Sequence, residues 1–163
     1  MKLHKKTLGC ICAVLISNNV IADEGYKPIT KIGSNMLSLL AVGDINIAFE
    51  RQIMKKLSTT FSAHYFKTKE LTGNEGSANR ISTGLRAYKD SQKLSGNFIE
   101  AKAAVIEFNE ATENAGPLSF EFYFGTSKNY NEFIFYEAKI GVLRLIDPGK
   151  IVPSGGFIIG GRF

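Results

Sequence analysis

Apolar and polar residues alternate with a period of two along much of the chain, which is the pattern of β-strands that have one apolar face. In the clearest stretch, Ile45, Ile47 and Phe49 share one side, and Asn46 and Ala48 lie between them on the other. The pattern predicts about eight strands, in the stretches 30–40, 44–50, 57–66, 80–88, 96–108, 118–124, 132–145 and 155–163. The facing of the first stretch is ambiguous, because either register leaves a polar residue on the apolar side.

The second face of these strands is charged in both signs and is interleaved with Gly, Ser, Ala and Asn. It carries Glu50, His64, Arg80, Arg86, Glu100, Lys102, Glu121, Glu137, Lys139 and Arg162. A soluble sandwich or lipocalin-like barrel would turn the apolar face inward, and a membrane barrel would turn it outward. Small residues mixed with charges suit the inside of a narrow barrel. The pattern therefore favours an all-β fold, an eight-stranded antiparallel up-and-down transmembrane β-barrel.

The connections between these strands differ in length. The turns at Lys55-Lys56 and at 90–95 are short, whereas 67–79, 109–116 and 146–154 are long. Membrane barrels have short periplasmic turns and longer external loops. We therefore expect both termini to be periplasmic and the three long loops to be external, with 41–43 as a short external turn and 67–79 as a possible binding loop for a surface ligand.

The first 22 residues are typical of an export signal, with Lys2, Lys5 and Lys6 before a short apolar stretch and a cleavage site after Ala22. The division is a signal peptide over 1–22 and a barrel domain over 23–163. Both cysteines, Cys10 and Cys12, leave with the signal, which excludes a disulfide scaffold. The three lysines leave as well, so the net charge falls from +5 to +2 and no longer argues for nucleic acid.

The chain ends in GGFIIGGRF, an alternating stretch that closes on a bare aromatic residue. Phe157, Ile159 and Phe163 share one parity, and this ending resembles the signal read by the bacterial barrel-assembly machinery. Gly161 departs from that signal, because an apolar or aromatic side chain usually stands there. The resemblance implies an outer-membrane location in a Gram-negative envelope, in contact with outer-membrane lipid and lipopolysaccharide, and a monomer is expected.

The stretch NMLSLLAVGDINIAFERQIMKKLS and the later GLRAY together resemble a family of small bacterial outer-membrane β-barrels of unknown function. The matching positions are Asn35, Phe49, Glu50, Arg51, Gly84, Arg86 and Tyr88. In length, export and ending the chain is also similar to the OmpX/Ail and OmpA-type eight-stranded barrels. The resemblance implies an integral outer-membrane protein and supplies no activity.

Burying a lone charge is costly, whereas a paired charge is tolerated. We therefore expect ion pairs inside the barrel among Glu50, Arg86, Arg80, Glu100, Lys102, Glu121, Glu137 and Lys139. Glu50 is expected to pair with Arg86 or with Arg80, because all three share the inward parity.

Two residues on one strand face, Ser62 and His64, are candidates for an esterase that modifies lipid A. A serine nucleophile needs a base and a third group that orients the base. The parity of Ser62 and His64 points both into the barrel and not toward lipid, and no acidic orienter can be identified from spacing. We therefore expect no enzyme, a structural or surface-binding protein, and no pore, since porin channels need about 16 strands. Neither a metal site nor a cofactor is expected. A lipid A esterase and a soluble periplasmic lipocalin-like barrel remain alternatives.

Overall fold

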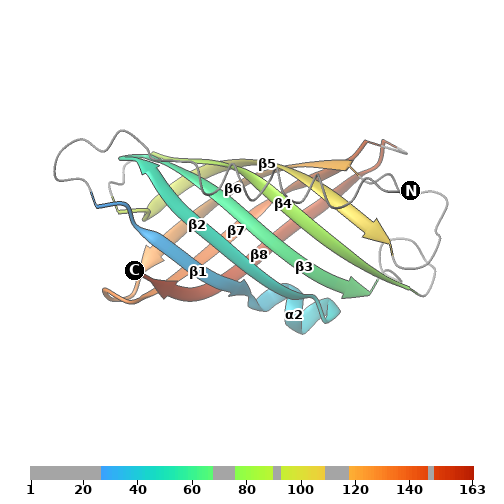
Figure 1. Ribbon diagram of the computed structural model, residues 1–163, viewed down its shortest axis with the longest axis horizontal. Helices are drawn as coiled ribbons and strands as arrows, with labels where there is room; N and C mark the ends of the chain where they lie inside the picture. Colours follow the sequence, from blue (N-terminus) through green and yellow to red (C-terminus); the bar gives the residue numbers. More distant parts are fainter. Residues whose placement is uncertain (1–26, 68–75, 90–92, 109–117, 147–148) are drawn as a thin grey trace, which may run out of the picture.

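A computed structural model describes residues 27–67, 76–89, 93–108, 118–146 and 149–163. The predicted signal peptide and the greater part of the long loops 67–79 and 109–116 lie outside these residues. The described residues form eight antiparallel strands that close into a barrel in the order of the chain (Figure 1). The strands are β1 (Thr30–Asn35), β2 (Ile45–Met54), β3 (Leu57–Lys67), β4 (Ser77–Tyr88), β5 (Gly96–Phe108), β6 (Leu118–Asn129), β7 (Ile134–Leu145) and β8 (Ile151–Arg162).

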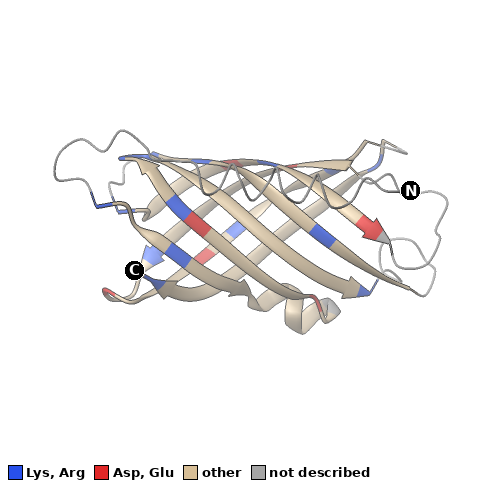
Figure 2. Ribbon diagram, in the orientation of Figure 1, with Lys and Arg blue, Asp and Glu red and all other residues tan. Residues whose placement is uncertain are grey.

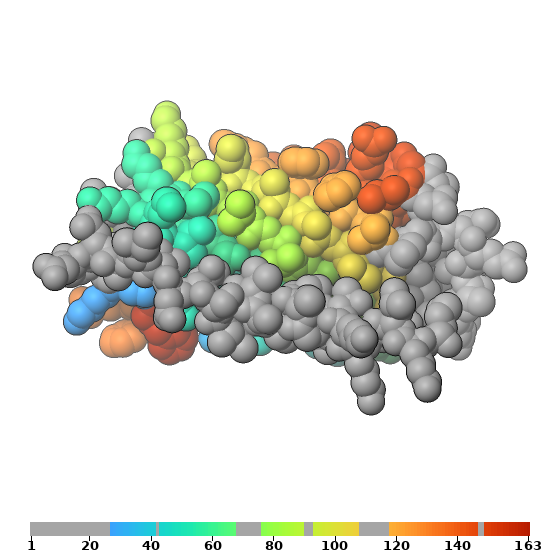
Figure 3. Space-filling model, turned by 45° about the horizontal axis from the view of Figure 1, so that its top comes forward, coloured from blue at the N-terminus to red at the C-terminus, as the bar shows by residue number. Residues whose placement is uncertain are grey.

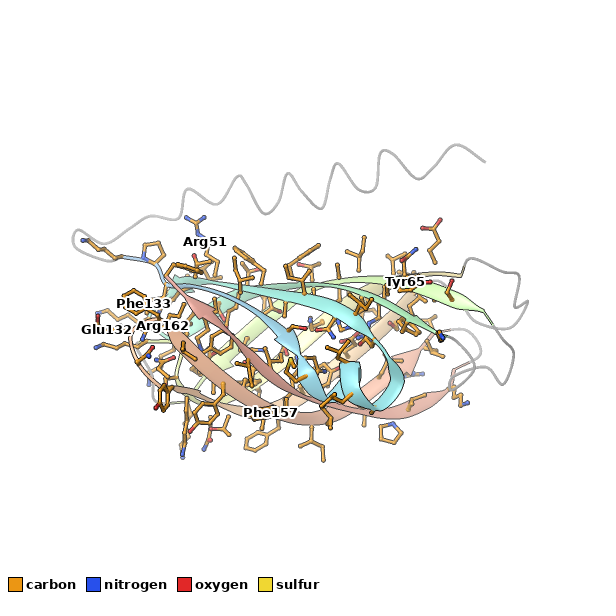
Figure 4. The ribbon with its side chains drawn as sticks, turned by 90° about the horizontal axis from the view of Figure 1, so that it is seen from below. Arg51, Tyr65, Glu132, Phe133, Phe157 and Arg162 are labelled. Carbon is orange, nitrogen blue, oxygen red and sulfur yellow. The ribbon has the colours of Figure 1, made fainter. Side chains whose placement is uncertain are left out.

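The two ends of the barrel differ. The end that holds Thr30 and Phe163 also holds the turn at Lys55-Lys56 and the turn at 130–133. Thr30 and Phe163 close the barrel there with two backbone hydrogen bonds of 3.0 and 2.9 Å. In Figure 4, Glu132, Phe133 and Arg162 lie together at this end, whereas Tyr65 lies toward the opposite end. We call the first end the terminal end and the other the loop end.

The first predicted strand is wrong in its second half, because β1 ends at Asn35 and a helix, α2 (Met36–Val42), follows. The Asn35 side chain accepts a hydrogen bond from the Ser38 backbone nitrogen at 3.4 Å, as an N-cap residue does. Gly43 ends the helix in the left-handed conformation, at a φ of 66°. The expected short turn at 41–43 is therefore the end of this helix. Among the described residues, no helix has the length and apolar content needed to cross a membrane.

The apolar face points out of the barrel and the polar face points in, as the strand pattern predicts. Phe122 is 56% exposed, Ile99 63% and Ile140 71%, whereas Glu100 and Glu121, on the same strands as Ile99 and Phe122, are buried. Figure 2 shows that charged positions lie along the body of the strands as well as at their ends. Figure 3 shows outward side chains side by side across the wall, from β3 (teal) to β7 (orange).

Two glycines on the inward face lie where the backbone of a neighbouring strand comes very close. A Cβ atom at Gly84 would overlap the Ala101 carbonyl oxygen, and one at Gly141 would overlap the Phe122 carbonyl oxygen. The neighbouring strand backbones approach too closely there for any other residue. At these two inward-facing positions the barrel therefore requires glycine.

Candidate functional site

Arg86 is the centre of an ion cluster inside the terminal half of the barrel. Its guanidinium nitrogens lie 3.0 Å from Glu50, 3.1 Å from Glu100 and 2.6 Å from Glu137. A second contact with Glu137, from Nη2 at 2.9 Å, makes that pair bidentate. The three carboxylates come from β2, β5 and β7, so this one cation ties together strands from different sides of the barrel. We call Arg86, Glu50, Glu100 and Glu137 the arginine cluster.

Neighbouring residues complete the arginine cluster. The Tyr88 hydroxyl donates to Glu50 at 2.9 Å, and the Lys139 ammonium donates to Glu100 at 3.0 Å. Lys31 is buried nearby, where its ammonium donates to the Leu94 carbonyl and, at 2.8 Å, to the Ser127 hydroxyl. The predicted pairing of Glu50 with Arg86 is therefore confirmed.

The other predicted pairing, between Glu50 and Arg80, is not formed. Arg80 faces Glu121 instead, at 3.6 Å, in the loop half of the barrel. Lys102 lies between the two halves, 4.0 Å from Glu100. The predicted lumen residues thus divide into the arginine cluster and a second group around Arg80 and Lys102.

The second group contains Ser62, His64 and Asp44 in a linear arrangement. His64 Nδ1 lies 2.9 Å from a carboxylate oxygen of Asp44, and His64 Nε2 lies 3.2 Å from Ser62 Oγ. Because Nδ1 faces a carboxylate, it carries the ring proton and leaves Nε2 as an acceptor. The acidic group that could not be identified from spacing is therefore Asp44, which precedes β2 and is buried.

Two cations flank this arrangement. Lys102 donates to Ser62 Oγ at 2.9 Å, and Arg80 Nη2 lies 3.2 Å from His64 Nε2. Ser62 also shares a hydrogen bond of 2.7 Å with Ser82. The two positive charges oppose protonation of the His64 ring, and the Asp44 carboxylate favours it.

Asp44 itself lies outside the strands, between α2 and β2. Burial alone would raise the pKa of its carboxyl group. The hydrogen bond with the His64 ring, the charge of that ring, a hydrogen bond with Ser38 and the Arg80 charge together outweigh burial and hold the pKa below its ordinary value. Asp44 is therefore an ionised partner for His64 at neutral pH.

A cavity of about 170 Å³ adjoins these residues in the loop half of the barrel. Ser62, His64 and Asp44 all line it, together with Arg80 and Lys102. Its remaining walls include the apolar side chains of Phe66 and Ile158. The cavity thus combines a possible nucleophile, a base, two cations and an apolar wall.

The remaining predicted residues lie on the outer wall. Phe157, Ile159 and Phe163 are all exposed on the outward face, and Phe157 points away from the barrel in Figure 4. Within the described residues, no group of three or more His, Cys, Asp or Glu side chains is arranged to hold a metal ion. The predicted binding loop 67–79 is described only at its two ends, where β3 ends and β4 begins.

The chain is classified by its fold, because comparison with known proteins finds no match. The chain matches no family model, no curated protein and no solved structure. The described residues form an all-β, eight-stranded antiparallel up-and-down closed barrel. This architecture is consistent with that of the OmpX-type barrels to which the sequence shows a resemblance.

Proposed function

We propose that this protein is an integral β-barrel of the bacterial outer membrane with a structural or surface-binding role. The observation that carries the proposal is the inverted polarity of the barrel. Its charged side chains are buried in the lumen, and large apolar side chains such as Phe122, Phe124 and Ile140 cover the outside. Monomeric soluble proteins rarely expose a contiguous apolar surface of this kind, whereas a membrane barrel requires it.

The alternative of a soluble lipocalin-like barrel needs the opposite polarity, with an apolar lumen that holds a ligand. Here the lumen is crossed by the arginine cluster, whose members are all buried and in which Arg86 donates hydrogen bonds to each of the three carboxylates. Among the described residues, the middle of the lumen is therefore charged and is not an apolar calyx. It also supports the expectation that the barrel conducts no ions, because the side chains of four strands meet across it.

The orientation follows from the two ends of the barrel. The terminal end carries the short turns and would face the periplasm, and the loop end would face outward and present 67–79 to lipopolysaccharide or a surface ligand. Phe157, Ile159 and Phe163 would serve as the signal for the barrel-assembly machinery, after residues 1–22 have directed export. This placement matches the short-turn, long-loop asymmetry of membrane barrels.

Fractionation of expressing cells tests the proposal. We expect the protein in the outer-membrane fraction, resistant to extraction by alkaline carbonate, and migrating faster on a gel when it is not boiled. The matched control is a variant with two charges on the outer wall, Phe122→Asp with Ile140→Asp, which should not enter the membrane fraction. Recovery of the unaltered protein in the soluble periplasmic fraction would overturn the proposal.

A further inference from the structure

The cavity in the loop half lies next to an interruption in the barrel wall. β1 has six residues, whereas its neighbours β2 and β8 have ten and twelve. Pairing of β1 with β2 extends to Gly33 opposite Ala48, and pairing of β1 with β8 extends to Asn35 opposite Ile158. From these last pairs to the loop end, β2 and β8 have no strand between them. We call this stretch, bounded by 45–47 and 151–157, the seam.

Where β1 ends, at the edge of the seam nearer the terminal end, side chains make the contacts with β8 and β2 that the backbone of β1 makes before that point. Asn35 accepts a hydrogen bond from the Phe157 backbone nitrogen at 3.0 Å and donates to the Gly155 carbonyl at 3.4 Å. From the other side, Asn46 donates to the Asn35 carbonyl at 3.2 Å and to the Ser38 hydroxyl at 3.0 Å. The wall is therefore held by amide side chains and α2, where the rest of the barrel has a continuous ladder.

The seam and the cavity share their lining. Asn35, Ser38, Asn46, Ser154 and Gly155 line the cavity and also border the seam. The helix α2 contacts both β8 and β2 at this place. Its outward side chains are apolar, with Leu37 at 55% and Leu40 at 81% exposed. The cavity thus has a side wall made of polar side chains, beside a helix that presents leucines to the surroundings.

We propose that Ser62, His64 and Asp44 form a catalytic triad that hydrolyses an acyl ester of a membrane lipid, with the acyl chain entering through the seam. The triad stands on the hydrogen bonds of His64 with Asp44 and Ser62, which is the arrangement of nucleophile, base and orienting group that serine hydrolases use. The choice of a lipid substrate rests on the membrane location proposed above. It departs from the expectation of no catalysis, which depended on the inward parity of Ser62 and His64 and on the absence of an orienting group. The structure supplies Asp44 as the orienting group and keeps both side chains inside the barrel, so the substrate must enter the cavity.

The geometry assigns each step to a residue. Ser62 Oγ attacks the ester carbonyl carbon while its proton passes to His64 Nε2, and the carbonyl electron pair moves onto the oxygen. The Lys102 ammonium donates to Ser62 Oγ at 2.9 Å and so places a positive charge beside the carbon under attack, where the oxyanion develops. The bond from carbon to the alcohol oxygen then breaks, and the leaving alcohol takes the proton from His64. Water attacks the acyl-serine in the same way, which releases the fatty acid and restores Ser62.

The surroundings fit these roles. Asp44 orients the His64 ring with Nε2 toward Ser62 and stabilises the imidazolium that forms when Nε2 accepts the serine proton, whereas the Arg80 charge beside Nε2 favours the neutral ring. A cavity volume of about 10–15 Å³ is enough to hold one water molecule. The cavity of about 170 Å³ therefore accommodates an ester group and the first part of a chain.

A fluorophosphonate probe tests the triad on the purified protein folded in detergent, independently of its location in the cell. We expect one phosphonyl adduct on Ser62, located by mass spectrometry of the unaltered chain. Labelling should be lost in Ser62→Ala and fall at least about 100-fold in His64→Gln and Asp44→Asn. The control is Ser119→Ala, which removes another buried lumen serine, one without a hydrogen-bond partner for its hydroxyl among the described residues, and should label normally.

The substrate class is tested with p-nitrophenyl esters of acetate and decanoate in the same detergent. We expect the decanoate ester to be hydrolysed at least about tenfold faster, and Ser62→Ala to hydrolyse neither above the rate without protein. Absence of an adduct on Ser62 in protein that migrates as a folded barrel would overturn the triad. Equal rates on both esters would overturn the lipid substrate and the role of the seam. A soluble protein that labels at Ser62 would refute the membrane proposal and leave the triad standing.

Discussion

Replacement of Arg86 by methionine removes the one cation that three buried carboxylates share. Methionine keeps much of the side-chain volume, so the change is mainly one of charge. Among the described residues, Glu50 and Glu137 then have no cation left within 4 Å in an ion pair, whereas Glu100 keeps Lys139 at 3.0 Å. Breaking a single buried pair costs about 3–5 kcal/mol. With two carboxylates left unpaired, we expect a loss of at least about 4 kcal/mol in the free energy of unfolding.

Urea unfolding in lipid vesicles measures this loss, with the gel mobility of unboiled samples as the readout of the folded barrel. The control is Arg51→Met, because Arg51 is exposed on the outer wall and belongs to no described ion pair. Surface substitutions of that kind change stability by about 0.5 kcal/mol or less. Arg86→Lys should fall between the two, since an ammonium cannot make the bidentate contact with Glu137.

A second substitution distinguishes an ion cluster from simple loss of packing. Adding Glu137→Gln to Arg86→Met removes one of the stranded charges and should restore part of the stability, although Glu137→Gln alone destabilises. Such non-additivity is expected only of residues in contact. A loss of less than about 1 kcal/mol for Arg86→Met, or strictly additive effects in the double variant, would refute the assignment of Arg86 as the electrostatic centre of the lumen.

Three further predictions concern other parts of the barrel. Gly141→Val places a side chain against the Phe122 carbonyl oxygen and should prevent formation of the heat-resistant folded band. The control, Ala103→Val on the outer face, should form that band. A folded Gly141→Val barrel would show that the strands can separate at this position. Because the folded pKa of Asp44 lies below its ordinary value of 3.8, this carboxylate stabilises the barrel fully above that pH and loses its contribution as the pH falls through the lower folded value. Asp44→Asn should therefore flatten the acid side of a plot of urea midpoint against pH, and an unchanged slope would contradict the role of the His64 contact. Removal of Phe163 should lower the yield of assembled barrel in cells but leave refolding of the purified chain into detergent unchanged; equal yields in cells would rule out an assembly role.

The alternation of residues predicted most of the strands, and the small and charged residues on the second face predicted which side points inward. On β6, Phe120, Phe122 and Phe124 point out of the barrel and Glu121 and Tyr123 between them point in, because successive side chains of a strand alternate between its two faces. The start of the chain was less readable. β1 gives way to α2 after six residues, and a helix of seven residues is too short to leave a clear period of its own.

The predicted inward positions include most residues of the arginine cluster and of the group around Ser62 and His64. The strand pattern does not show which of these residues are in contact. Arg86 lies opposite Glu100 in the β4–β5 register, whereas Glu137 reaches it across the lumen from β7. Which strands face each other across a barrel depends on closure and tilt, which no local pattern contains. The contact of Asp44 with His64 depends instead on the β2–β3 register. Asp44 lies two residues before Asn46, the register partner of His64, and a spacing of 20 positions in the chain does not reveal that pairing. Lys31 was missed because the first strand could be read in either register.

A spin-label scan along β6 tests most directly whether the apolar face meets lipid. The chain after Ala22 has no cysteine, so single cysteines at 119–124 can each carry one nitroxide without background labelling. In lipid vesicles, we expect labels at 120, 122 and 124 to be reached by oxygen, which concentrates in the bilayer, and to be shielded from a water-soluble nickel reagent. Labels at 119, 121 and 123 should show the lower oxygen access of a filled lumen. Access of the nickel reagent to 120, 122 and 124, or oxygen access without a period of two, would contradict a membrane-embedded barrel.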